Sequence, residues 1–354
     1  MSAGRLLVVT TVHTPDDARI RAKLIGTLSA EWDVTYAARH PGPTDPSGLI
    51  WHPLAGGRVR RWWSAARLMQ AKTWDLVAVH DPELLPAALM RAWRGRRTLF
   101  DVHENVPAQI RTKAWIPSVL RKPLSGVAGL LLRAAERVMT VTLAEEAYRQ
   151  LFRNQHPVLA NYLAAPLPSP VPAAEPPFLA YLGDVTEQRG AFLAIEAAAG
   201  AGMRLVMVGR VAPPELVNRL AAEALAQEVI LELDGAQPHP SALARIAPAR
   251  AGLSPLADIP NYRDSLPTKV LEYLALGLPV LAADLPGTRA VTGDRVGMTF
   301  VAPGDRDAWR RAGEELAATT SRRADVMAHA VETRRAFSWP AAEVLRVYRQ
   351  AARR

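Results

Sequence analysis

The chain of 354 residues contains no cysteine. This absence excludes disulfides, thiolate zinc sites and a cysteine nucleophile. No apolar run reaches the roughly 18 residues that a membrane-spanning helix requires. The start of the chain, MSAGRLLVVTTVH, lacks the charged region, long apolar core and cleavage site of a signal peptide, and it is typical of a first β-strand. We therefore expect a cytoplasmic protein.

Two nucleotide-binding motifs are also missing. No G-x-G-x-x-G follows the first expected strand, where the chain reads TTVHTPDDARIR, and the sequence contains no G-x-x-x-x-G-K-[ST] phosphate loop. Nicotinamide-dependent and P-loop chemistry are therefore not expected.

Positive charge is in excess, and it is unevenly placed. The net charge is +9, with 22 Lys and Arg against 13 Asp and Glu in residues 1–168 and 21 of each in the remainder. Much of the excess lies in two clusters, GGRVRRWWSAARLMQAK and RAWRGRR. Such a patch attracts phosphates or an anionic membrane surface. A solvated face of an arginine-rich protein is an equally good interpretation.

Short apolar runs alternate with helical patterns along the chain. In the first half, the runs that predict strands are residues 5–12, 33–39, 75–80, 98–103 and 138–142, and residues 17–31 form an amphipathic helical pattern. In the second half, the runs are residues 178–183, 203–209, 229–235, 249–256 and 279–284. Apolar strands spaced by helices are typical of parallel, doubly wound α/β sheets. The length of the chain suits two such domains.

A proline-rich segment separates the two halves. The sequence LAAPLPSPVPAAEPPF holds six prolines, which fix φ and remove backbone donors, so a stiff extended linker is expected. We predict an N-terminal Rossmann-like domain over 1–161, the linker over 162–177, a C-terminal Rossmann-like domain over 178–337 and an amphipathic helix over 338–354. Ser338 is the expected N-cap of that last helix, which should pack back toward the N-terminal domain.

The stretch DSLPTKVLEYLALGLPVLAAD, residues 264–284, combines polar residues with a helical pattern. Pro267 suits the first turn of a helix, with Ser265 as its N-cap. Lys269 and Glu272, three residues apart, would share a face of that helix. Free amides at the helix start, together with Lys269, form a ready anion site.

Acidic residues flank this expected anion site. Asp264 precedes the helix, and Glu272 lies eight positions further along. Carboxylates beside a bound anion suit hydroxyl groups rather than more phosphate, and a diphosphate flanked by two sets of sugar hydroxyls is a nucleotide sugar. A surface helix with an ordinary Lys–Glu pair is the alternative interpretation.

The same stretch resembles glycosyltransferase family 4, which comprises retaining enzymes of the GT-B fold. LPTKVLEY is similar to the P-x-K-x-x-E-Y of a subset of that family. The resemblance extends over nearly the whole chain, through TTVHTPDDARIRAKLIGTLSAEWDVT, FDVHENVP, YLGDVTEQRG and FSWPAAEVLRVY. It implies two Rossmann-like domains that face a cleft, with residues 1–161 binding the acceptor and residues 178–337 binding the nucleotide sugar. The implied reaction is transfer of a sugar from a nucleoside-diphosphate sugar to an acceptor hydroxyl with retention, without a metal or other cofactor. The implied acceptor is a surface glycan or a lipid-linked intermediate, with a secondary metabolite as the alternative.

The resemblance also implies residue roles in the donor site. Glu272 would bind ribose hydroxyls, Asp264 would contact hydroxyls of the transferred sugar, and Arg189 and Lys269 would neutralise the diphosphate. Two positions depart from the family pattern, because Asp264 replaces the usual Glu and Asp184 the usual Arg. Further positions of the implied donor site are Gly183, Ser265, Leu266, Pro267 and Thr268. Arg189 could instead be an ordinary surface charge.

In the first domain, the resemblance implies a residue that approaches the transferred sugar and a set of acceptor contacts. His103, in FDVHENVP, matches the family's histidine, although a hydrogen-bonded loop histidine is the alternative. The implied acceptor contacts are Asp17, Arg19 and Glu104. N-capping explains Asp17 equally well, and Glu104 is equally well explained as a solvated loop carboxylate.

Neither a metal nor a nucleic acid is expected as a partner. The sequence DRD at 305–307 is better explained by helix capping than by an Asp-x-Asp metal motif. Trp62 and Trp63 lie beside Arg60 and Arg61, so this segment could attach the protein peripherally to the inner face of the membrane. Tryptophans packed inside the domain are an equal alternative.

Two other functions stay open at this stage. A GT-B-fold nucleotide-sugar epimerase would act on the same donor without an acceptor. A non-catalytic binding protein would not need the set His103, Arg189, Lys269 and Glu272. The sequence does not name the sugar, the nucleotide base or the acceptor.

Overall fold

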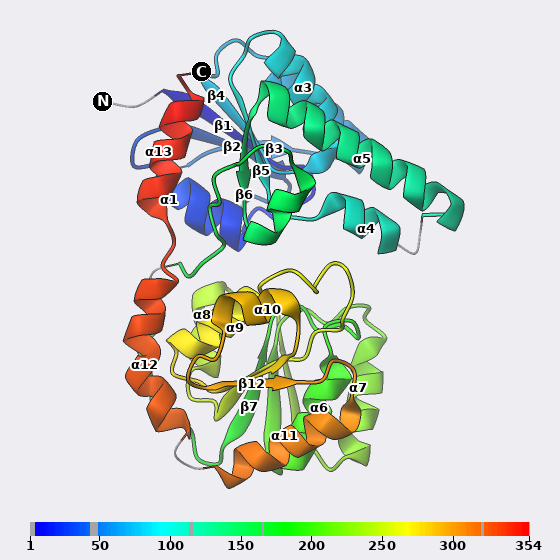
Figure 1. Ribbon diagram of the computed structural model, residues 1–354, viewed down its shortest axis with the longest axis vertical. Coiled ribbons are helices and arrows are strands. Elements are labelled where there is room, and N and C mark those ends of the chain that lie inside the picture. The colour runs from blue at the N-terminus through cyan, green and yellow to red at the C-terminus, as the bar shows by residue number, and fades with distance from the viewer. Residues whose placement is uncertain (1–3, 43–48, 113–115, 165, 320–321, 354) are drawn as a thin grey trace. The chain divides into compact units, whose positions relative to one another are not determined.

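The computed structural model describes residues 4–42, 49–112, 116–164, 166–319 and 322–353. The chain forms two compact units (Figure 1). Unit 1 consists of Met1–Asn161 together with Trp339–Arg354, and unit 2 of Tyr162–Ser338. Within the described ranges, no helix is both long enough and apolar enough to cross a membrane.

Unit 1 is built on a six-stranded parallel sheet with the order β3-β2-β1-β4-β5-β6. Its strands are β1 (Arg5–Val9), β2 (Asp33–Arg39), β3 (Ile50–Leu54), β4 (Leu76–Val79), β5 (Thr98–Val102) and β6 (Thr140–Leu143). β1, β4 and β5 are buried along their whole length except at Arg5, because helices cover both faces of the sheet. The sequence pattern missed β3, which carries Pro53 and lies at the edge, where a missing backbone donor is tolerated.

The helices of unit 1 form two layers around this sheet. They are η1 (Ala18–Ile25), α1 (Gly26–Leu28), α2 (Arg58–Met69), η2 (Pro82–Leu84), α3 (Leu85–Trp93), α4 (Val106–Thr112), α5 (Ser118–Val138), η3 (Glu146–Leu151) and α13 (Ala341–Ala351). α2, α3 and α5 contribute to the core on one face, and η1, α1 and α13 cover the other. α13, drawn in red in Figure 1, lies beside α1, and its Val344 and Tyr348 are fully buried.

Ser338 does not cap α13. Pro340 occupies the N-cap position without a side-chain bond, and the Ser338 hydroxyl lies 3.3 Å from the Arg335 carbonyl at the end of the preceding helix. The helix therefore begins later than predicted, because Trp339 and Pro340 first turn the chain onto unit 1. The Trp339 indole fixes this turn by donating to the Thr27 hydroxyl (2.9 Å).

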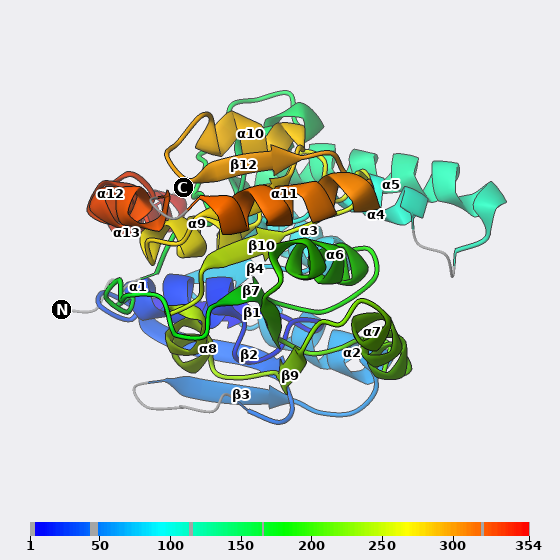
Figure 2. The same ribbon diagram turned by 90° about the horizontal axis from the view of Figure 1, so that it is seen from below.

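Unit 2 repeats the architecture with the strand order β12-β11-β10-β7-β8-β9. Its strands are β7 (Phe178–Leu182), β8 (Arg204–Val208), β9 (Leu231–Gly235), β10 (Ala251–Ser254), β11 (Val280–Ala283) and β12 (Met298–Val301). The helices are α6 (Ala191–Ala201), α7 (Leu216–Ala226), α8 (His239–Ile246), α9 (Thr268–Ala275), α10 (Pro286–Thr292), α11 (Arg306–Ala318) and α12 (Arg322–Ala336). Figure 2 shows α6 beside α11, and both add residues to the core on one face of the sheet. The prediction of two parallel, doubly wound sheets is confirmed.

The proline-rich segment is held against unit 2. Its Ala174 amide donates to the Pro248 carbonyl (2.8 Å), and Arg323 and Arg334 of α12 donate to the carbonyls of Val171 and Pro168. The described residues of 162–177 contain no helix, as their prolines require. The segment is therefore a strap bonded to unit 2 rather than a separate linker.

Each sheet has one point at which the strand order reverses. It lies between β1 and β4 in unit 1 and between β7 and β10 in unit 2, because the chain builds outward from these pairs in opposite directions. In open α/β sheets, ligands bind outside the carboxyl ends of the strands at such a switch point. The loops that follow β1, β4, β7 and β10 are therefore the places to look for function.

Candidate functional site

The loop after β7 is shaped by two glycines. Gly183 (φ +102°) and Gly190 (φ +77°) adopt conformations that other residues rarely adopt. A Cβ on Gly190 would lie 1.8 Å from the carbonyl oxygen of Pro255, which follows β10. The two loops of the unit 2 switch point thus touch through a glycine, and Arg189 immediately precedes this contact.

α9, the helix after β10, begins at Thr268 and ends at Ala275. The prediction that Ser265 is its N-cap was wrong: Pro267 is the N-cap residue, and the Ser265 hydroxyl lies 3.4 Å from the Tyr262 carbonyl. Among the residues that the structure describes, no side chain caps the helix start. The first amides of α9, at the positive end of the helix dipole, therefore stay available to an anion. Every residue from Lys269 to Ala275 is buried, which excludes the surface-helix alternative.

Lys269 is a buried cation without a hydrogen-bond partner. Its side chain belongs to a residue that is 6% exposed, and among the described residues nothing accepts a hydrogen bond from its ammonium group. The ammonium lies 4.0 Å from the centre of the Tyr181 ring. Burial and the positive charge of Arg189 lower the pKa of Lys269 to about 7, and the carboxylate of Glu272 offsets only part of this shift. An anion at this position would remove the cost of the buried charge.

Arg189 is the second cation at this switch point. Its guanidinium lies over the Tyr262 ring, 5.7 Å from the ring centre, and 3.9 Å from the place that a Cβ on Gly183 would occupy. None of the hydrogen bonds or ion pairs found among the described residues uses its side chain. Two neighbouring cations without a carboxylate partner form a site that attracts a polyanion.

Two tyrosines hold the strand ends of unit 2 together. The Leu182 amide donates to the Tyr273 hydroxyl (2.7 Å), which in turn lies 3.3 Å from the Leu253 carbonyl. A Cβ on Gly252 would fall inside the Tyr273 ring at 2.2 Å, so glycine is required in β10 at this point. The Tyr181 hydroxyl lies 2.9 Å from the Asp184 carbonyl. These contacts fix the position of the Tyr181 ring, over which the Lys269 ammonium lies.

The predicted acidic residues of unit 2 lie in different environments. Glu272 accepts from His239 (2.8 Å), a residue at the start of α8 that the sequence analysis missed. Asp264 is exposed, and the close approach of Gly287 holds its backbone, since a Cβ there would lie 2.4 Å from the Asp264 carbonyl carbon. Asp184, at the usual Arg position, forms an exposed ion pair with Arg210 (3.3 Å).

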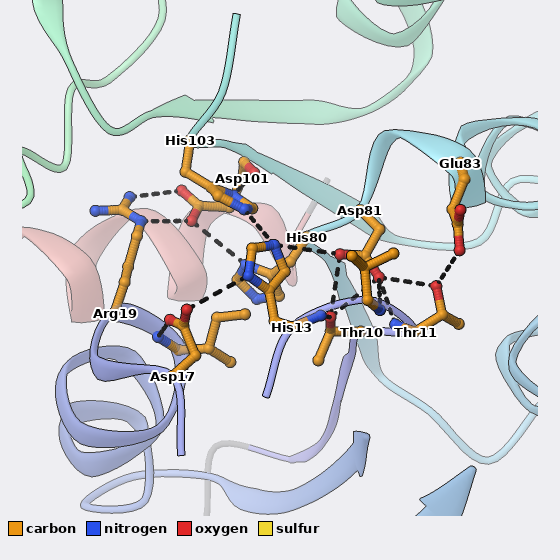
Figure 3. Close-up of polar contacts among 12 residues, drawn as sticks. Thr10, Thr11, His13, Asp17, Arg19, His80, Asp81, Glu83, Asp101 and His103 are labelled. Atoms are coloured by element: carbon orange, nitrogen blue, oxygen red, sulfur yellow. Dashed lines mark hydrogen bonds and ion pairs between the residues drawn. The ribbon is translucent and has the colours of Figure 1, made fainter. Parts of the chain in front are cut away.

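At the switch point of unit 1, Asp81 ties the loop after β1 to the end of β4. Its carboxylate accepts from the hydroxyls of Thr10 (3.0 Å) and Thr11 (2.9 Å) and from the amide of Val12 (3.1 Å), and the Thr11 amide also donates to it (Figure 3). Asp81 is 1% exposed. A buried carboxylate with four donors is satisfied within the protein and holds the loop rigid.

Arg19 and Asp101 form a second buried pair. The guanidinium donates twice to the Asp101 carboxylate (2.9 and 2.8 Å) and once to the Leu159 carbonyl (2.9 Å). Burial would raise the pKa of Asp101, but the charge of Arg19 holds it well below its usual range. Arg19 is 5% exposed and lies over the Trp339 ring. This geometry gives Arg19 a structural role in unit 1, and the acceptor contact that the resemblance implied stays a prediction.

His103 follows β5 and contacts His13, which follows β1. Their Nε2 atoms lie 2.8 Å apart, and His13 Nδ1 lies 3.4 Å from an oxygen of Asp17 (Figure 3). Asp17 also caps η1 by accepting from the Ile20 amide (3.0 Å), so the capping interpretation of this residue is confirmed. Glu104 is half-buried near this pair, and its negative charge favours the protonated form of both histidine rings.

Two groups of side chains in unit 1 have ligand atoms within reach of a common metal ion: His13, His103 and Glu104, and His80, Asp101 and His103. In both groups, some of these ligand atoms already contact other protein side chains. His13 and His103 share a short contact, and both oxygens of Asp101 bind Arg19. The expected absence of a metal stays a prediction for both groups. In unit 2, Asp305 of the DRD sequence caps α11 by accepting from the Ala308 amide (2.9 Å), as predicted.

Sequence reasoning missed His13, His80, Asp81 and His239. The first three share one signal that was available: each follows an apolar strand, and parallel neighbours bring their carboxyl ends to one edge of the sheet. His239 carries no such signal, because it reaches Glu272 only through the packing of α8 against the sheet.

The two doubly wound units, each with polar residues at its switch point, define the GT-B fold of glycosyltransferases. Residues 168–331, which lie within unit 2, match the family model described as glycosyl transferases group 1. No curated protein sequence matches the chain.

Solved structures of glycosyltransferases are similar in fold. Sucrose-phosphate synthase from Thermosynechococcus elongatus has a TM-score of 0.78 at 16% identity, with 98% of each chain covered. HepE from Anabaena, in complex with UDP-glucose, has a TM-score of 0.70 at 12% identity, covering 99% of this chain and 98% of its own. WaaG, a glycosyltransferase involved in lipopolysaccharide biosynthesis, has a TM-score of 0.68 at 14% identity, covering 97% and 99%. At these identities the likeness shows the fold.

Proposed function

We propose that the protein is a retaining, metal-independent glycosyltransferase that moves a sugar from a nucleoside-diphosphate sugar to an acceptor hydroxyl. The observation that carries this proposal is the buried ammonium of Lys269, which has no hydrogen-bond partner among the described residues and lies beside Arg189. A folded protein keeps such a costly group where a ligand compensates it.

The chemistry requires that the departing diphosphate be stabilised as its negative charge develops. Lys269, Arg189 and the uncapped start of α9 supply positive charge and donors for this purpose without a metal. The bond from the anomeric carbon to the diphosphate oxygen breaks, and the bond to the acceptor oxygen forms through an oxocarbenium-like transition state. We assign the acceptor proton to a diphosphate oxygen, which is the front-face route.

The remaining roles follow the donor's hydroxyl groups. Glu272, held by His239, would accept from the ribose hydroxyls, and Asp264, exposed in the loop before α9, from hydroxyls of the transferred sugar. The proposal places the donor in unit 2, whose residues match the family model, and the acceptor in unit 1. HepE, described in complex with UDP-glucose, supports a nucleotide sugar as the donor class.

Calorimetry and thermal shift with a panel of nucleoside diphosphates and their sugars, without metal, test this proposal. Stabilisation by one nucleotide in the wild type, with loss of binding in Glu272→Ala, is the expected result. Product analysis then separates the transferase from an epimerase, because an epimerase would convert the donor into an isomer without an acceptor. Failure of every nucleotide to bind would overturn the donor site.

We also propose that unit 1 attaches to an anionic membrane, where a lipid-linked glycan acceptor would be found. α5 exposes a row of apolar side chains: Val119, Leu120, Leu124, Val127 and Leu130. Exposed Lys122, Arg133 and Arg137 lie on the same helix. An apolar face flanked by cations is the pattern of an interfacial helix. A soluble secondary metabolite is the alternative acceptor.

The tryptophans of α2 contribute unequally to such a surface. Trp62 donates to the Glu83 carbonyl (2.8 Å) and packs against the core, whereas Trp63 is 64% exposed. Flotation with anionic liposomes should show binding that Leu124→Glu with Leu130→Glu removes. Leu225→Glu, at a leucine of unit 2 that is more exposed than either of these, is the control for adding a carboxylate at the surface. Absence of wild-type binding at moderate salt would exclude the attachment.

A further inference from the structure

Two histidines at the switch point of unit 1 face each other through ring nitrogens. His13 Nε2 lies 2.8 Å from His103 Nε2 (Figure 3). A hydrogen bond between two ring nitrogens needs one N–H donor and one lone pair, so the rings share a single proton along this line. What each ring contacts through its other nitrogen decides which of the two is the donor.

The other nitrogen of His103 identifies this ring as the acceptor. Its Nδ1 lies 3.1 Å from the backbone carbonyl of Asp101. A carbonyl oxygen only accepts, so Nδ1 carries the proton. Burial lowers the pKa of His103, and the charge of His13 lowers it further. The ring is therefore neutral, and its Nε2 has a free lone pair for the bond.

The surroundings of His13 favour a second proton on its ring. Nδ1 lies 3.4 Å from an Asp17 oxygen, and Nε2 lies 3.4 Å from an Asp81 oxygen. Burial alone would lower the pKa of His13, but the hydrogen bond with Asp17 and the charges of Asp81, Asp17 and Glu104 raise it to about 8. Burial would raise the pKa of Asp17, yet the bond with His13 holds it well below its usual range, so its carboxylate stays charged.

The other charged groups that face the pair come from β4, β5 and η1. They are His80, whose Nδ1 lies 3.4 Å from Asp101, and Asp101 itself, which Arg19 neutralises. The Arg19–Asp101 pair keeps its charges throughout the neutral range, because the pKa of Asp101 is held low and that of Arg19 is raised.

We propose that His13 is a positioning residue for His103: as an imidazolium it donates to His103 Nε2, fixes that ring as its Nδ1–H tautomer and occupies its lone pair. If His103 contacts the transferred sugar, a sugar hydroxyl must displace His13 from this lone pair. A charge-assisted hydrogen bond is about twice as strong as a neutral one, so displacement becomes easier once His13 loses its proton. This last step rests on the proposed function, whereas the protonation of the pair does not.

Nitrogen NMR of the full chain, labelled at its 8 histidines, tests the protonation directly. Near neutral pH we expect two pyrrole-type ring nitrogens for His13, and one pyrrole-type (Nδ1) and one pyridine-type (Nε2) nitrogen for His103. His13→Gln assigns the signals, and His329→Gln, in an exposed helix of unit 2, should leave both rings unchanged. A protonated Nε2 on His103, or a neutral His13 at pH 7, would overturn the proposal.

Kinetics test the consequence for the donor. The KM ratio of wild type to His13→Gln should fall severalfold as pH rises through about 8, because the glutamine amide remains a neutral donor at every pH. Taking the ratio cancels the titration of Lys269, which both proteins share. A flat ratio in proteins that turn over would overturn the displacement step. Failure of both proteins to bind any nucleotide would overturn the proposed function, while the NMR result would still decide the protonation of the pair.

Discussion

The switch points of the two units occupy equivalent places in equivalent sheets, yet they treat buried charge in opposite ways. In unit 1, Asp81 accepts four hydrogen bonds and Arg19 is paired with Asp101. In unit 2, Lys269 is as deeply buried and has no hydrogen-bond partner among the described residues. A satisfied charge stabilises its own unit, whereas an unsatisfied one costs stability until a ligand arrives. The paired charges at the switch point of unit 1 therefore hold the structure together, whereas the charge of Lys269, at the switch point of unit 2, is available to a ligand.

The largest effect on stability should come from breaking the buried Arg19–Asp101 pair of unit 1. Asp101→Asn leaves the Arg19 guanidinium buried without its carboxylate, and removing one partner of a buried pair costs about 3–5 kcal/mol. Chemical unfolding of the variant should show this loss. Asp33→Asn, at an exposed aspartate at the start of β2, is the matched control and should change little. A stable Asp101→Asn protein would mean that the Arg19–Asp101 pair is not needed for the stability of unit 1.

The same kind of substitution in unit 2 should have the opposite sign. Lys269→Met removes a buried charge that has no hydrogen-bond partner within the described part of the chain, so the ligand-free variant should be more stable than the wild type. Its unfolding midpoint should rise by roughly 2–4 °C for each kcal/mol gained. It should also lose donor affinity by roughly 30- to 1,000-fold, the effect of deleting a buried charged contact worth about 2–4 kcal/mol.

Thermal unfolding and calorimetry on one preparation of Lys269→Met measure both changes. Lys72→Met, at an exposed lysine of unit 1, controls for the loss of charge. A variant that is destabilised while it still binds nucleotide would contradict the assignment of Lys269 to the donor site.

The proton balance of donor binding follows from the lowered pKa of Lys269. Because burial lowers it to about 7, the ligand-free protein carries fewer protons here than the unfolded chain between pH 7 and the ordinary lysine value, so its stability from this group rises with pH in that window. A bound diphosphate favours the ammonium form and raises the pKa again. Binding at about pH 8 should therefore take up a substantial fraction of one proton.

Calorimetry in buffers of different ionisation enthalpy measures this proton uptake. Lys269→Arg, which stays charged, should bind without it. Equal apparent enthalpies for the wild type in all buffers would show that Lys269 does not meet the diphosphate.

Much of the fold and part of the site followed from the sequence, for identifiable reasons. Strands such as β1 and β7 are buried on both faces, so their apolar runs mark them, whereas β3 and β12 lie at sheet edges, are only partly buried and were missed. Lys269 and Glu272 were found because they lie on one short helix. The buried polar pairs of unit 1, such as Thr10 with Asp81 and His13 with His103, were not found. Each joins residues about 70 to 90 positions apart, which only the folded sheet brings together.

The smallest effect should come from the exposed ion pair that stands where the family pattern has an arginine. Arg210 and Asp184 lie 3.3 Å apart, and their side chains are 69% and 43% exposed. Such a pair contributes about 0–1 kcal/mol, so Arg210→Met should leave stability nearly unchanged, because solvent already screens both charges.

Donor affinity separates the two arginines of unit 2. Arg189→Met should weaken nucleotide binding markedly, since no carboxylate in the described ranges forms an ion pair with its guanidinium. Arg210→Met should weaken binding only slightly, because Arg210 is already paired with Asp184. Titration of both variants with one nucleoside diphosphate makes the test. Equal losses of affinity would mean that Arg210 separates from Asp184 and binds the phosphate when the donor is present. Arg210 would then be a second donor-binding cation and not only part of a surface ion pair. Unequal losses in the expected order would show that pairing within the protein, more than charge alone, decides which cations bind the donor.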